Sequence, residues 1–122
     1  MTTYSFFIST EPYKFQATDS LIELSKALIA KGHQIKGFFF YGSGVYNLKK
    51  DISSGTSIRD VPKKIQDFTL EYHIPVSGCS TWVSLTGLKD HEFIDGATEE
   101  GLGDFSNWSV ESDKMIVFGP GA

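Results

Sequence analysis

The apolar run at residues 35–41, IKGFFFY, constrains the fold more than any other stretch of this sequence. Its side chains do not alternate between apolar and polar, as they do in a strand that has one face in water. A strand with both faces covered has this pattern, which is typical of a parallel sheet between two layers of helices. Glycines at positions 42 and 44 follow the run and indicate that the strand ends there.

Helix-like and strand-like segments alternate along the rest of the chain. Apolar residues at positions 17, 21, 24 and 28 share one face of a helix, and Gly32 follows as a helix stop. Apolar spacing over residues 58–72 predicts a second helix, which tolerates Pro62 because this residue lies in the first turn. We also expect strands at residues 4–9, 74–79, about 97–99 and 114–119, and helices at residues 80–88 and 102–110.

This alternation predicts a single α/β domain over residues 1–122, built as a three-layer α/β/α sandwich. Its sheet is expected to be open, mostly parallel and made of about five strands. Sites in such sheets gather at the carboxyl ends of the strands. The segment YGSGVYN (residues 41–47), after the second strand, and Cys79, after the third, therefore share one edge of the sheet.

The composition excludes several classes of function. Eleven basic against fifteen acidic residues leave a net charge of −4. This balance lacks the excess of positive charge that direct binding of nucleic acid or of an anionic membrane requires. The N-terminus lacks a basic segment and a long apolar core, and no apolar run approaches the roughly 20 residues that span a bilayer. One cysteine and three histidines suggest neither an intrachain disulfide nor a zinc site, so we expect a cytoplasmic protein with no metal and no cofactor.

Cys79 is the candidate nucleophile, and the residues around it leave two interpretations open. Free cysteines are often buried as small apolar side chains, which favours a structural thiol. A cysteine between a strand and the N-terminus of a helix, by contrast, lies at the positive end of the helix dipole, which favours the reactive thiolate. Spacing alone does not separate these two interpretations of Cys79.

The YGSGVYN segment supplies the other candidate residues, which are Tyr41, Gly44, Tyr46 and Asn47. A Gly-Ser-Gly segment can cradle a phosphate, but the lysine and hydroxyl of a P-loop are missing, so an ordinary turn is favoured. Tyr46 and Asn47 could order this loop or contact a ligand. A Cys–His hydrolase would depend on His91, the histidine that could approach Cys79.

Three blocks of the sequence resemble the DsrE/TusD family of sulfur-relay proteins. ALIAKGHQIKGFFFYGSGVYN, at residues 27–47, is similar to the family's first helix, second strand and GVYN segment. IPVSGCSTWVSLTGL, at residues 74–88, carries Cys79 at the family's active position, and GLGDFSNWSVESDKMIVFG, at residues 101–119, is similar to its closing helix and strand. The resemblance runs in order through nearly the whole chain.

The resemblance implies a sulfurtransferase that carries sulfur as a persulfide on Cys79 and hands it to an acceptor protein. Family members of this type act in tRNA thiolation or in sulfur oxidation, and they work as oligomers of DsrE/F/H-like subunits. Donor and acceptor proteins are therefore the expected partners. Family members often place arginines soon after the cysteine, whereas the first basic residue here is Lys89.

Two other classes of function stay open on the sequence. The chain could be a non-catalytic assembly subunit, with Trp82, Phe93 and Trp108 on an aromatic surface and an unreactive Cys79. It could also be a small-molecule binder of the flavodoxin type that uses YGSGVYN.

Overall fold

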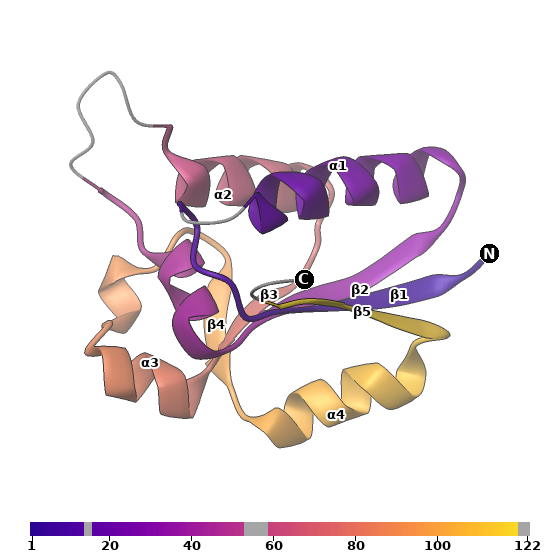
Figure 1. Cartoon of the computed structure of the whole chain (residues 1–122). Coiled ribbons are helices and arrows are strands. Elements are labelled where there is room, and N and C mark those ends of the chain that lie inside the picture. Colours follow the sequence, from indigo (N-terminus) through magenta and orange to yellow (C-terminus); the bar gives the residue numbers. More distant parts are fainter. Residues whose placement is uncertain (14–15, 53–58, 120–122) are drawn as a thin grey trace.

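The computed structural model describes residues 1–13, 16–52 and 59–119, and it shows a five-stranded sheet with helices on both faces (Figure 1). The strands are β1 (Thr3–Ile8), β2 (Gln34–Phe40), β3 (Val76–Cys79), β4 (Ala97–Glu100) and β5 (Lys114–Phe118). The α-helices are α1 (Ala17–Ala30), α2 (Val61–Glu71), α3 (Ser80–Thr86) and α4 (Leu102–Glu111), and two short 3-10 helices are η1 (Gly42–Leu48) and η2 (Asp90–Glu92).

The strands lie in the order β4-β3-β2-β1-β5, and every neighbouring pair is parallel. The chain therefore builds outward from β1 to β4 and then returns to place β5 beside β1. Helices α1 and α2 cover one face of the sheet, and α3 and α4 lie on the other (Figure 1). The three-layer α/β/α architecture expected from the sequence is confirmed.

Some element boundaries differ from the sequence-based expectation. The second helix begins at Val61, where the Asp60 carboxylate accepts a hydrogen bond from the Lys63 N–H and Pro62 occupies the first turn. The expected start at Ile58 lies outside the described residues. The loop expected after β2 takes the form of the 3-10 helix η1, Gly42–Leu48, whose first turn is closed by the hydrogen bond from the Gly44 N–H to the Tyr41 carbonyl oxygen.

Two apolar clusters, one on each face of the sheet, explain why the IKGFFFY run does not alternate. Phe38 and Phe40 of β2 belong to the larger cluster, which also holds Leu21 of α1 and Ile65 of α2. Phe39 points to the opposite face and joins the smaller cluster. The buried members of that cluster are Phe39, Cys79 and Phe105, and the partly buried members are Phe7, Tyr41, Trp82 and Trp108.

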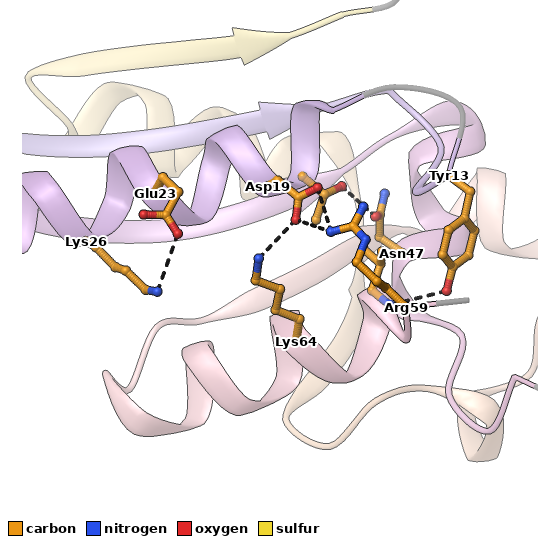
Figure 2. Close-up of polar contacts among 9 residues, drawn as sticks. Tyr13, Asp19, Glu23, Lys26, Asn47, Arg59 and Lys64 are labelled. Atoms are coloured by element: carbon orange, nitrogen blue, oxygen red, sulfur yellow. Dashed lines mark hydrogen bonds and ion pairs between the residues drawn. The ribbon is translucent and has the colours of Figure 1, made fainter. Parts of the chain in front are cut away.

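Helices α1 and α2 are joined at the surface by a small network of ion pairs (Figure 2). The Asp19 carboxylate of α1 lies 2.8 Å from Arg59 Nη1 and 3.0 Å from Lys64 Nζ. The hydrogen bond from Arg59, with a further one from Lys64, holds the pKa of Asp19 below its ordinary value. Across the described ranges, no helix has both the length and the apolar character needed to cross a bilayer.

Candidate functional site

Cys79 ends β3 and is the N-cap residue of α3. Its backbone is extended, with φ −63° and ψ 121°, and its side chain makes no capping hydrogen bond. Because Gly78 pairs with Phe40 in the parallel register, Cys79 lies beside the point where β2 gives way to η1. The structure thus places Cys79 and the YGSGVYN segment at the same carboxyl edge, as the sequence predicted.

The Cys79 thiol is enclosed by aromatic side chains. Cys79 is 3% exposed and packs with Phe39 of β2 and Phe105 of α4 in the smaller apolar cluster. Tyr41 and Trp82, both partly buried, pack against the same cluster, and their ring centroids lie 5.8 Å apart. The candidate nucleophile is therefore at the expected edge of the sheet but is screened from solvent.

Asn47 turns out to be a structural residue of the YGSGVYN segment. Its side chain is fully buried, and its amide donates hydrogen bonds to the carbonyl oxygens of Thr10, at 2.9 Å, and Gly44, at 2.8 Å. Its carbonyl oxygen accepts a hydrogen bond of 2.8 Å from the Thr18 hydroxyl. Two of these bonds tie η1 to Thr10, just after β1, and to the first turn of α1, and the third lies within η1, so Asn47 orders the loop.

Gly44 has a steric reason to be glycine. A Cβ atom there would lie 2.4 Å from the carbonyl oxygen of Ile8, a fixed backbone atom at the end of β1. The lack of a side chain lets η1 pack directly on β1. The sequence offered no signal for this contact, since Ile8 is far from Gly44 along the chain.

Tyr46 points away from Cys79's cluster toward a different feature of the same edge. It is 44% exposed and lines a cavity of about 540 Å³ together with Tyr13, Lys49 and Pro62. The Tyr13 hydroxyl accepts a hydrogen bond from the Val61 N–H, which fixes one wall (Figure 2). Of the four residues proposed for the loop, Tyr41 is the one that joins Cys79.

Among the described residues, no hydrogen bond joins a histidine to Cys79. His91 is exposed on η2, whereas Cys79 is buried. His33 Nδ1 accepts a hydrogen bond from the Thr2 N–H, and its backbone N–H caps α1 at the Leu28 carbonyl oxygen. The described residues also contain no group of three or more His, Cys, Asp or Glu side chains arranged to hold a metal.

Acidic side chains occur on the strand beside Cys79. Cys79 pairs in register with Glu100 of β4, and the preceding residue, Glu99, is hydrogen-bonded to Asp90. This hydrogen bond, together with burial and the charge of Asp90, raises the pKa of Glu99 above its ordinary value. Lys89, the first basic residue after Cys79 in the sequence, is exposed.

The fold and the position of Cys79 together define a class of protein. Its members have an open parallel α/β sheet with one cysteine at the carboxyl end of an inner strand. Within that class, the chain belongs to the DsrE/DsrF-like family, whose family model matches residues 3–118. The match spans nearly all of the chain, as the resemblance in the sequence predicted.

Named relatives of this chain are described as sulfurtransferases. A sulfurtransferase TusD homolog from Aliivibrio fischeri is 26% identical over 126 residues, which cover 94% of this chain and 97% of the relative. A putative sulfurtransferase DsrE from Allochromatium vinosum is 25% identical over 123 residues, which cover 92% of this chain and 95% of the relative. These similarities support a family role in sulfur relay.

Solved structures show the same fold. The ychN protein from E. coli superposes with a TM-score of 0.82 at 18% identity, covering 97% of this chain and all (100%) of that one. A protein of unknown function from Methanobacterium thermoautotrophicum gives a TM-score of 0.67 at 15% identity, covering 95% of this chain and 99% of that one.

Proposed function

We propose that this protein is a sulfur carrier that accepts sulfane sulfur on Cys79 and passes it to an acceptor protein. The Cys79 thiolate attacks the outer sulfur of a donor persulfide, R–S–SH. A bond forms between Cys79 Sγ and that sulfur while the donor's S–S bond breaks, and the donor leaves as the thiolate R–S⁻. The product is Cys79–S–SH, and attack by an acceptor thiolate on its outer sulfur restores the Cys79 thiolate.

The observation that carries this proposal is the position of the chain's single cysteine at the carboxyl end of β3, in a member of a family with sulfurtransferase relatives. A carrier needs one thiol. With no second cysteine in the chain, the persulfide has no internal partner with which to form a disulfide, so it persists until an acceptor arrives.

The test is the intact mass of the purified protein after exposure to a polysulfide donor. Wild-type protein is expected to gain whole sulfur atoms that a reductant removes. Cys79→Ser and Cys79→Ala are the matched controls, because each removes the only thiol. Sulfur uptake by a folded Cys79→Ala protein, or no uptake by wild-type protein when a donor protein is also supplied, would reject Cys79 as the carrier.

A second function, a non-catalytic assembly subunit, is favoured by one observation: Cys79 is 3% exposed. In that role the thiol is a packing group of the aromatic cluster. This alternative predicts that a thiol reagent labels the protein only after unfolding, even when donor and acceptor proteins are present.

The partners of the sulfur-relay role are proposed to be a donor protein, an acceptor protein and neighbouring DsrE-like subunits, either copies of this chain or paralogues. Four exposed apolar side chains support assembly into an oligomer: Leu102 and Val110 on α4, and Met115 and Val117 on β5. The acidic balance of the chain favours a protein acceptor over direct contact with tRNA. A reducing compartment such as the cytoplasm suits a carrier that relies on one free thiol.

A further inference from the structure

The burial of Cys79 has a consequence for the sulfur-carrier function. Sulfur transfer requires the Cys79 thiolate to reach the outer sulfur of the donor persulfide, so the thiol must be accessible at the moment of reaction. In the structure this residue is 3% exposed and lies among aromatic rings. Some part of the aromatic enclosure must therefore move before sulfur is transferred.

One side of the enclosure is interlocked and is poorly suited to move. Phe39 and Phe105 stack with their ring centroids 4.8 Å apart, and Phe7 lies 5.2 Å from Phe105 and 6.0 Å from Phe39. Phe39 is fully buried in β2, between β1 and β3. Displacing any of these rings would disrupt several aromatic contacts at once.

The other side of the enclosure has fewer aromatic contacts, although Trp82 also packs against the larger apolar cluster. Trp82 lies in the first turn of α3, three residues after Cys79, and packs against the cluster that holds Cys79. Among the described residues its ring has one aromatic partner, Tyr41, in an edge-to-face contact. Tyr41 packs on Phe7 as well, with ring centroids 5.2 Å apart, so Trp82 is the ring of the enclosure with the fewest aromatic partners.

Helix α3 itself is short enough to shift. It has seven residues and buries one of them, Val83. A helix of two turns is not stable by itself in water and depends on its packing. It ends at Gly87, which adopts a left-handed conformation with φ 76° and gives the helix a sharp end. Local opening of such an element costs less free energy than global unfolding.

We propose that Trp82, which rests on Tyr41, is a movable aromatic cover over the Cys79 thiol, and that its displacement must precede sulfur transfer. Trp82 is then a gating residue that decides which thiol-reactive molecules reach Cys79. In the resting protein the cover keeps small oxidants and electrophiles away from the thiol. This inference rests on the proposed carrier function for its purpose, but the cover is testable without any sulfur donor.

Trp108 provides a matched control from the same cluster. It packs beside Gly37 in the middle of β2, where an added Cβ would lie 2.5 Å from the Trp108 ring. Its ring also contacts Phe39 and Phe105, whereas the ring contact of Trp82 is with Tyr41. Removing Trp108 therefore tests whether loosening the cluster is by itself enough to expose the thiol. Leu85, which is 68% exposed on α3, controls for changes in that helix.

The experiment measures the rate of Cys79 alkylation by iodoacetamide in the folded protein, with intact-mass detection, for wild type, Trp82→Ala, Trp108→Ala and Leu85→Ala. Trp82→Ala is expected to accelerate alkylation by about tenfold or more, because the opening equilibrium then no longer limits access. The two controls are expected to stay within about twofold of wild type. Tyr41→Ala and Trp82→Leu repeat the test should Trp82→Ala fail to fold.

The outcomes separate the cover from the carrier function. Fast alkylation of wild-type protein, or equal acceleration by Trp82→Ala and Trp108→Ala, would overturn the cover and leave sulfur transfer untouched. Fast alkylation of Trp82→Ala, with slow alkylation of wild type and of both control variants, supports the cover. If neither that variant nor wild-type protein then took up sulfur, even with a donor protein supplied, the carrier function would be rejected while the cover over the thiol stood.

Discussion

At the scale of single residues, two kinds of residue lie at the carboxyl edge of the sheet. Some stabilise the structure, and others are candidates for chemistry. Gly44 and Asn47 belong to the first group, because one permits a close backbone approach and the other is fully hydrogen-bonded and buried. Cys79 is the residue proposed to take part in chemistry, and its thiol makes no capping hydrogen bond. Substitutions at these positions should therefore differ in kind.

Gly44→Ala is expected to destabilise the protein by about 2–3 kcal/mol, because its Cβ would meet the Ile8 carbonyl and force η1 away from β1. Gly103→Ala is the control, since a Cβ there meets nothing within 4 Å and alanine favours the helix. Chemical denaturation measures both. Equal stability of the two variants would show that η1 does not need this contact.

Cys79→Ser is expected to be less stable than Cys79→Ala by about 1 kcal/mol or more, because serine buries a hydroxyl among aromatic rings. Thermal unfolding of the two variants side by side provides the measurement. A more stable serine variant would indicate that the site holds a hydrogen-bond partner for the hydroxyl.

At the scale of elements, α1 and α2 are joined at their N-terminal ends by Asp19. Asp19→Asn is expected to lower stability by under about 1 kcal/mol at neutral pH, the range for partly exposed ion pairs. The folded protein holds the pKa of Asp19 below its ordinary 3.8, so this stabilisation is complete above that pH and is lost as the pH falls through the lowered pKa.

Urea denaturation of wild type and Asp19→Asn between neutral pH and pH 3 measures this dependence. The difference between the two proteins should be constant at neutral pH and should shrink in acid. Asp67→Asn, which removes the Lys63 pair within α2, is the control that leaves the link between the helices intact. A difference that grew in acid would contradict the assigned direction of the pKa shift.

At the scale of the whole molecule, a parallel sheet normally has both faces covered. Here Met115 and Val117 of the edge strand β5 are 43% and 57% exposed, and Val110 of α4 is 83% exposed. We expect neighbouring subunits to cover these side chains.

Light scattering should therefore give a molar mass of several chains for wild type, or for wild type mixed with a paralogous subunit. Val117→Lys should shift the assembly toward the monomer, because a charge would enter an apolar contact. Ser20→Lys adds the same charge at an exposed polar position of α1, on the opposite face of the sheet, and should leave assembly unchanged. A monomeric wild type, alone and with paralogues, would rule out this surface as a subunit contact.

The sequence by itself determined the order of helices and strands, the parallel sheet and the position of Cys79 at its carboxyl edge. It could do so because apolar periodicity, prolines and glycines act over a few neighbouring residues. The tertiary structure alone decided that Asn47 is buried, that Tyr46 faces a separate cavity and that Cys79 is enclosed. Each of these features depends on contacts between segments far apart in the chain, such as the packing of Phe105 of α4 near the end of β3. Such contacts cannot be predicted from the spacing of apolar residues, prolines and glycines within one segment.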